Sequence, residues 1–221
     1  MPSDHMTVKP LILAFDTSAA HCAAALLRGH DIVSQRLEPM ARGQAERLMP
    51  LLEEVLAEGG ASYGDLQAIG VGIGPGNFTG IRISVSAARG LALGLDLPAI
   101  GVSSLDAQAF GQTGTVISSL DARRDHLYLQ IADGAPGLYT PDSLPPLPQD
   151  DRPICIGHMA DDIAGRCGGI VASPRYATAE AIARVAASRL GQPDLPAPAP
   201  LYLREADAAP SHDTPPALLD A

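Results

Sequence analysis

The sequence predicts an α/β protein of two related lobes, of which the second is reduced. Three short apolar runs separated by short polar turns precede an alternation of helical and strand patterns, which is the order of a mixed sheet with helices packed on it. That order then begins again. With a constant offset of 105 residues and no gap, the repeat matches residues 11–15 with 116–120, Asp16 with Asp121, His21 with His126, and Gly29 with Gly134.

The first lobe is expected over residues 10–112. Strands are predicted at 11–15, 22–27 and 32–37, a helix at 44–58, a strand at 68–72, a helix beginning near Thr79, a strand at 99–102, and a helix opened by Ser103 or Ser104. Connections as short as those between the first three strands produce an antiparallel meander. A meander followed by this alternation is typical of ribonuclease-H-like folds.

The second lobe is expected over residues 113–204. After its first two strands, residues 134–153 contain six prolines and are predicted to form a long loop. A strand at 154–156, a helix at 160–166, a strand at 170–172, a helix at 178–190 and a last ordered segment at 201–204 follow. Residues 1–9 and 205–221 are expected to be a disordered leader and a disordered tail.

The composition argues against several classes of function. The 221 residues are 46% hydrophobic and carry a net charge of -10, which argues against nonspecific attraction to a polyanion, so any nucleic acid is expected to be held by a partner. The three cysteines (Cys22, Cys155 and Cys167) lack CxxC spacing and are predicted to be buried thiols. We expect a cytoplasmic protein without a membrane-spanning segment.

The turn between the strand at 68–72 and the next helix is rich in glycine, with Gly74, Gly76 and Gly80. It matches neither common phosphate-binding loop. A dinucleotide fingerprint would need a glycine at Thr79, and a Walker loop would need a lysine where Ile81 stands. The only lysine in the chain is Lys9, so lysine-dependent phosphate chemistry is not expected.

Two helices carry candidate interface residues. Gly80, Ser84, Ala88 and Ala92 stand four apart, so they share one helix face that another helix could approach closely. The helix at 44–58 contributes Leu48, Leu52, Val55 and Leu56. In a lobe whose sheet needs covering on one side, these residues cannot all face inward, so we expect some apolar surface to remain exposed.

Metal and nucleophile signatures are missing. No two of the six histidines stand three or four apart, and no serine lies in a G-x-S-x-G elbow, which argues against a metalloprotease and a serine hydrolase. Arg82 and Arg89 are seven apart on one helix face. They could contact a phosphate or an acidic partner, or they could simply form a solvated face.

Five segments resemble the bacterial tRNA threonylcarbamoyladenosine biosynthesis proteins of the TsaB family. They are LILAFDTSAA, GIGPGNFTGIRISVSAARGLALG, IGVSSLDA, LDARRDHLY and PLYLR, in that order between about residues 10 and 204. The resemblance implies the two-lobed actin, sugar kinase and chaperone fold. It also implies a vestigial nucleotide cleft containing Asp16, Thr17 and Asp121. The sequence shows no partner groups for a nucleotide, which favours the alternative that these aspartates are turn residues that satisfy local N–H groups.

The same resemblance implies a function. The chain would be a noncatalytic subunit, with no cofactor, that binds and activates the catalytic relative TsaD and works with the ATPase TsaE on the residue beside the tRNA anticodon. Its two interface helices would pack against TsaD, or against a second copy in a homodimer when it is alone, and tRNA would be reached only through the complex. The alternative is an active, ATP-binding enzyme of the same superfamily.

Overall fold

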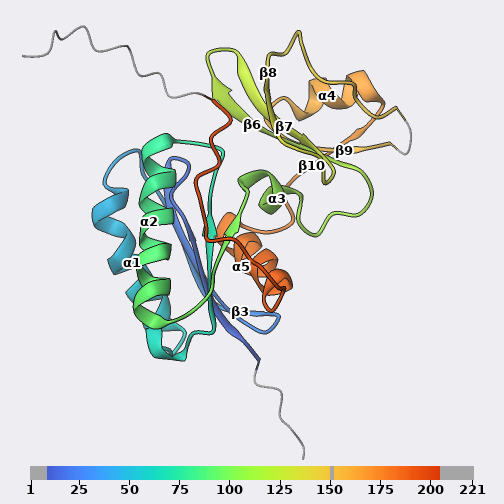
Figure 1. Ribbon diagram of the computed structural model, residues 1–221. Coiled ribbons are helices and arrows are strands. Elements are labelled where there is room, and N and C mark those ends of the chain that lie inside the picture. The colour runs from blue at the N-terminus through green and yellow to red at the C-terminus, as the bar shows by residue number, and fades with distance from the viewer. Residues whose placement is uncertain (1–8, 150–151, 205–221) are drawn as a thin grey trace, which may run out of the picture.

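The computed structural model describes residues 9–149 and 152–204, and within them the chain forms two lobes (Figure 1). Each lobe contains one five-stranded sheet. The strand orders are β3-β2-β1-β4-β5 and β8-β7-β6-β9-β10, so the second sheet repeats the topology of the first. The predicted α/β fold of two duplicated ribonuclease-H-like units is confirmed. The predicted leader and tail lie, apart from Lys9, outside the described residues.

The first sheet is organised around β1. Its strands are β1 (Leu11–Asp16), β2 (His21–Arg28), β3 (Asp31–Pro39), β4 (Ala68–Gly72) and β5 (Ala99–Val102). β1 pairs antiparallel with β2 and parallel with β4. All six residues of β1 are buried, as expected of a continuous apolar strand that is covered on both faces.

Helices cover both faces of this sheet. α1 (Gln44–Glu58) and α2 (Phe78–Leu95) pack on one face, with the short 3₁₀ turn η1 (Tyr63–Asp65) between α1 and β4. α3 (Ser104–Ala109) lies between the lobes (Figure 1). Of the two serines that could open α3, Ser103 is the cap, because its side chain accepts a hydrogen bond from the Leu105 amide at 3.1 Å.

The position of α5 (Thr178–Arg189) differs from the predicted division into lobes. Residues 113–204 were expected to form one lobe, but α5 packs on the other face of the first sheet (Figure 1). Its Ile182 and Ala186 are fully buried with Ile12 of β1. The buried second face of β1 requires an apolar cover, and the alanine-rich helix provides one that can approach the strands closely.

The second lobe is smaller. It consists of β6 (Val116–Arg123), β7 (His126–Ile131), β8 (Gly137–Tyr139), β9 (Ile154–Gly157), β10 (Ile170–Ala172) and α4 (Ala160–Cys167). β8 lies inside the predicted loop. It is a three-residue edge strand between prolines, too short to show a period in the sequence.

All three cysteines are buried and free, as predicted. Burial is the main cause that raises the pKa of Cys22 to about 11 and that of Cys155 to about 12, which keeps both thiols protonated. Among the described residues, no helix is long and apolar enough to cross a membrane.

The residues predicted to form the partner interface belong instead to the core of the first lobe. Leu48, Leu52, Val55, Leu56, Gly80, Ser84 and Ala88 are buried, and Ala92 is half-buried against the same core. The predicted seam on α2 therefore faces the chain's own sheet. Small residues fit the close packing there, because an added Cβ on Gly80 would overlap the Thr17 carbonyl oxygen, and the Ser84 hydroxyl donates to the Gly72 carbonyl oxygen at 3.1 Å.

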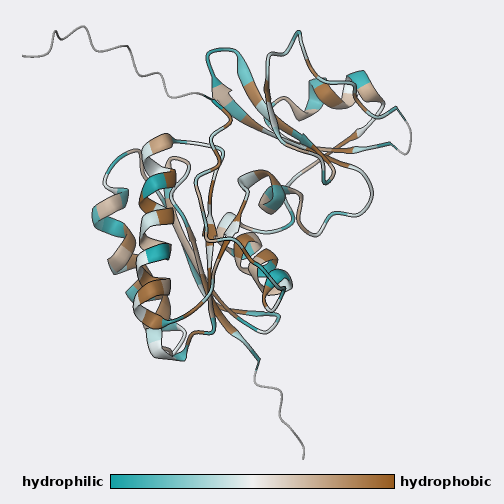
Figure 2. Cartoon of the chain, in the orientation of Figure 1, coloured by the Kyte–Doolittle hydropathy of each residue, from teal (hydrophilic) through white to brown (hydrophobic). Residues whose placement is uncertain are grey.

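The opposite face of α2 is exposed. It carries Arg82, Ser86, Arg89, Gly90 and Leu93. Added Cβ atoms at Gly90 and Gly94 would meet open space. Figure 2 shows that the C-terminal turns of α2 are hydrophobic, and Leu93 there is 85% exposed.

An ion-pair network ties α1 to β3. The Arg47 guanidinium donates to Glu38 of β3 at 2.7 Å and to Glu54 of α1 at 2.7 Å, and Arg36 bonds Glu58. Hydrogen bonds from Arg47 hold the pKa of both Glu38 and Glu54 below its usual range. A carboxylate whose folded pKa is lowered stabilises the fold above its unfolded pKa, about 4.3, and loses that contribution as the pH falls through the folded value.

Substituting Arg47→Met should therefore flatten the acid side of the stability profile. The wild-type chain should lose more free energy of unfolding between pH 7 and pH 3 than the variant does, measured by urea denaturation at both pH values. Arg42→Met, in the exposed turn before α1, is the control and should behave like the wild type. Equal losses in the wild type and in Arg47→Met would contradict the role given to the network.

Ala88 and Gly90 provide a matched test of the inward seam. Ala88→Arg should destabilise the chain by about 3 kcal/mol or more, because it forces a bulky charge into a filled core. Gly90→Ala should be neutral or stabilise by up to about 1 kcal/mol, since the site is exposed within a helix. Thermal melts of both variants test whether the seam is buried. A stable Ala88→Arg chain would mean that the seam faces solvent.

Candidate functional site

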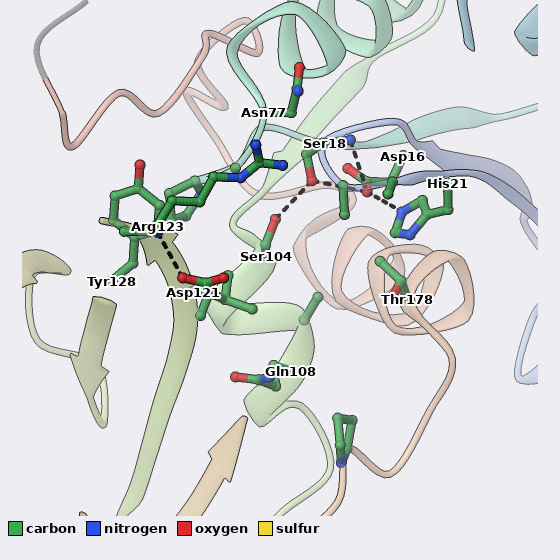
Figure 3. A pocket seen from close by; sticks show the side chains of 18 of the residues that line it. Asp16, Ser18, His21, Asn77, Ser104, Gln108, Asp121, Arg123, Tyr128 and Thr178 are labelled. Carbon is green, nitrogen blue, oxygen red and sulfur yellow. Dashed lines mark hydrogen bonds and ion pairs between the residues drawn. The ribbon is translucent and has the colours of Figure 1, made fainter. Parts of the chain in front are cut away.

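A cavity of about 590 Å³ lies between the two lobes. The first lobe lines it with the turn after β1, the residues before α2, and α3; the second lobe contributes the end of β6 and Tyr128 of β7. Figure 3 shows side chains from both lobes pointing into it. Asp16 and Asp121, the repeat-related carboxylates, both line this cavity, as the duplicated fold predicts.

Asp16 is 1% exposed and is used to hold its own turn. Its Oδ2 atom accepts hydrogen bonds from the Ser18 amide at 3.2 Å and the Ser18 hydroxyl at 3.0 Å, and it lies 2.7 Å from Nε2 of His21 (Figure 3). The other oxygen, Oδ1, has no hydrogen-bond partner among the described residues. A Cβ on Gly72 would overlap this carboxylate, so glycine at 72 is required by the position of Asp16.

Thr17, the third residue expected in the cleft, does not line the cavity. Its hydroxyl is buried and donates to the Gly80 carbonyl oxygen at 2.6 Å. Next to it, the Asn77 amide donates to the Ser18 carbonyl oxygen at 2.6 Å. These two bonds fasten the turn after β1 to the beginning of α2, so the Thr17 hydroxyl has a structural use and is not offered to a ligand.

The same contact accounts for the glycine-rich turn. A Cβ on Gly76 would overlap the Ser18 carbonyl oxygen, and a Cβ on Gly80 would overlap that of Thr17. Gly74 adopts a positive φ of 89°, a conformation that favours glycine. Gly76 and Gly80 are therefore needed for close approach to the backbone of residues 17 and 18, and Gly74 for the conformation of the turn.

Asp121 is placed differently from Asp16. It is exposed, and its Oδ1 accepts the Arg123 amide at 2.7 Å within the β6–β7 turn. His126 contacts the Arg124 carbonyl oxygen at 2.6 Å, so the pairing of Asp16 with His21 is not repeated in the second lobe. The reason is the turn length, because β6 continues to Arg123 and places that residue opposite His126.

Most of the lining residues were not predicted, and Gln108, Arg123, Tyr128 and Arg204 are among them. In Figure 3 the Arg123 side chain reaches from β6 towards Asn77 and Ser18 of the first lobe. Arg204 donates to the Ala122 carbonyl oxygen at 3.0 Å, and Oε1 of Gln108 is buried without a partner among the described residues. The sequence signals were the arginines in LDARRDHLY and PLYLR, and neither segment has a period that indicates a site.

The cavity therefore has a carboxylate on one side that is already hydrogen-bonded, and guanidinium groups on the other. Within the described residues, no three His, Cys, Asp or Glu side chains are grouped so that they could hold a metal ion. Such a lining can bind a polar ligand, and among the described residues the one hydroxyl in it that contacts a carboxylate, that of Ser18, donates to Asp16 within the turn after β1.

Known proteins resemble this chain over both lobes. The family model described as TsaD, tRNA N6-adenosine threonylcarbamoyltransferase, matches residues 38–135. The tRNA threonylcarbamoyladenosine biosynthesis protein TsaB of Bacillus subtilis is 33% identical over 180 residues, which span 72% of this chain and 79% of that protein. TsaB of Escherichia coli is 39% identical over 122 residues, but the match spans only 53% of this chain and 52% of that protein.

A solved structure agrees with these matches. YeaZ from Pseudomonas aeruginosa superposes with a TM-score of 0.72 at 26% identity, and the match covers 88% of this chain and all (100%) of that one.

The different roles of Asp16 and Asp121 can be tested by the stability of their alanine variants. Asp16→Ala should lower the free energy of unfolding by about 2–4 kcal/mol, because it leaves buried donors of Ser18 and His21 without an acceptor. Asp121→Ala, at the equivalent but exposed position, should cost less than about 1 kcal/mol. Urea denaturation measures both, and an Asp16→Ala variant as stable as Asp121→Ala would return Asp16 to the list of candidate ligand-binding groups.

Proposed function

The chain belongs to the TsaB family, and from this membership we propose that it acts in the biosynthesis of threonylcarbamoyladenosine in tRNA as a noncatalytic subunit. The main support for a role in this pathway is the similarity to proteins named tRNA threonylcarbamoyladenosine biosynthesis protein TsaB. In the Bacillus subtilis relative this similarity extends over most of the chain. The chemistry is proposed to take place on a partner.

The state of the cleft supports a noncatalytic role. Oδ2 of Asp16 is bonded within its own turn and the Thr17 hydroxyl is bonded to α2, so among the described residues Oδ1 of Asp16 is the one side-chain oxygen of this pair without a partner. Lys9, the single lysine of the chain, lies at the exposed end of β1 and pairs with Asp31 at 3.3 Å, so no lysine side chain reaches the cavity. An ATP-binding enzyme of the same fold would need free groups where this chain has engaged ones.

The proposed partner is a subunit of the TsaD type, with a TsaE-type ATPase in the same complex. The surface proposed for the TsaD-type subunit is the exposed face of α1 and α2, which carries Met49, Ser86, Gly90, Leu93 and Gly94. It replaces the buried seam that the sequence indicated. Without this partner, a second copy of the chain can occupy the same surface, which makes a homodimer.

Two exposed glycines of α2 favour this assignment, Gly90 in the helix interior and Gly94 in the last turn. A glycine in a helix interior costs about 1 kcal/mol relative to alanine, and nothing in the chain itself requires Gly90 or Gly94, because added Cβ atoms there meet open space. Small residues four apart allow another helix to approach the backbone of α2 closely. Leu93, 85% exposed, adds an apolar side chain that such a contact would bury.

The test is reconstitution of threonylcarbamoyladenosine formation from the purified full chain, the TsaD-type and TsaE-type proteins of the same organism, and tRNA. Omitting the chain should abolish product. Leu93→Glu should weaken binding to the TsaD-type subunit by at least about tenfold through loss of apolar burial and an unpaired charge, with product formation falling in parallel and the melting temperature unchanged.

Val171→Glu is the control, because Val171 is an exposed apolar residue on β10 of the other lobe. It should bind and support modification like the wild type. Product formed equally well without the chain would reject the proposed function, whereas a Leu93→Glu chain with unchanged affinity would reject only this surface.

A further inference from the structure

Two exposed aromatic rings stack on each other at the N-terminal end of α2. The rings of Phe78 and Tyr202 have centroids 4.7 Å apart and an interplanar angle of 25°. The Arg82 guanidinium lies 4.5 Å from the centroid of Phe78. Phe78 is 40% exposed and Tyr202 is 43% exposed, so the stack lies open to solvent.

Hydrogen bonds on either side of Tyr202, one from a backbone amide and one from a guanidinium group, fix its position. The Leu201 amide donates to the Ile73 carbonyl oxygen of the first lobe at 2.8 Å, and Arg204 donates to Ala122 of the second lobe at 3.0 Å. Leu203 packs with Tyr128 and Leu105. The ring is therefore held in place before any ligand arrives, which reduces the entropy lost on binding.

The charge around the stack is opposite to that of the whole chain. The chain carries a net charge of -10, yet α2 contains no acidic residue and has Arg82 and Arg89 on its exposed side. Arg123 and Arg204 line the cavity beside Asn77, the residue that precedes Phe78. The acidic side chains in that lining are Asp121 and Asp16, and Asp16 is buried against His21.

We propose that this surface binds single-stranded RNA, with an unpaired base stacked on Tyr202 and the flanking phosphates near Arg82, Arg123 and Arg204. Aromatic rings with neighbouring guanidinium groups bind unpaired bases because every base has a π-face and every nucleotide a negative charge. The inference rests on the proposed function, in which the substrate of the complex is a tRNA. It adds a direct RNA contact to a chain otherwise expected to reach tRNA only through its partner.

Charge and composition favour RNA over a protein partner here. Among the described residues, the exposed large apolar side chains at this end of α2 are the two stacked rings, and none of them is aliphatic. Leu93, which belongs to the proposed subunit surface, lies about 22 Å further along α2 at 1.5 Å per residue. The two surfaces can therefore be occupied at the same time.

The experiment measures fluorescence anisotropy of a fluorescein-labelled single-stranded RNA of about ten nucleotides, titrated with the full chain at about 50 mM salt. Saturable binding is expected, and a duplex of the same sequence should bind at least about tenfold more weakly. Tyr202→Leu, which keeps apolar packing, should weaken binding about five- to tenfold or more, whereas Tyr202→Trp should retain it. Arg123→Gln should weaken binding and lower the slope of log affinity against log salt by about one.

Arg166→Gln on α4 removes the same charge on a different face and is the matched control, which should bind like the wild type. The inference is overturned by absence of saturable binding, by equal binding of duplex and single strand, by unchanged binding of Tyr202→Leu in a chain that melts normally, or by equal losses in Arg123→Gln and Arg166→Gln. A Tyr202→Leu chain that keeps RNA affinity but binds the TsaD-type subunit less well would assign the surface to protein instead. Because the assay contains no other protein, its failure leaves the reconstitution test of the proposed function unaffected.

Discussion

The beginning of α2 packs directly on the backbone of the turn after β1, and the rest of the first lobe depends on that contact. Thr17 and Ser18 bond to Gly80 and Asn77, and glycine is needed at 76 and 80 because no side chain fits between the two segments. Asp16, the end of β1, is held in the same place by Ser18 and His21. One steric requirement thus explains a glycine-rich loop that resembles a phosphate-binding turn by composition alone.

The two copies of the repeat show how such a contact is lost. β6 follows β1 in its pairing with an antiparallel and a parallel neighbour, but it runs on into a tight turn with positive φ at Arg123, Arg124 and Asp125. The carboxylate of Asp121 then satisfies only its own turn. As a result, the cavity between two topologically equivalent lobes is chemically asymmetric. The carboxylate on the β1 side is buried and bonded to Ser18 and His21, whereas the β6 side carries the exposed Asp121 together with Arg123 and Arg204.

Most elements could be predicted because their apolar residues recur at the period of a helix or strand, and α1, β4 and β5 lie where the pattern indicated. The orientation of the helices could not. The spacing of Gly80, Ser84 and Ala88 shows that they share a face, but only the burial of β1 on both sides shows that this face looks inward. A repeat likewise suggests self-contained lobes, and nothing local in α5 reveals that it covers the first sheet. Arg123 and Arg204, far apart in the chain, meet at the cavity only through the tertiary fold.

The path of the chain at its described C-terminal end has a mechanical consequence. Within the described residues, the backbone passes between the lobes at three places, around α3, between β10 and α5, and at residues 201–204 (Figure 1). Two neighbouring crossings would leave an axis for hinge rotation, whereas a third, bonded to Ile73 on one side and Ala122 on the other, acts as a brace across that axis. Rotation of one lobe relative to the other would therefore strain the hydrogen bonds at both ends of residues 201–204.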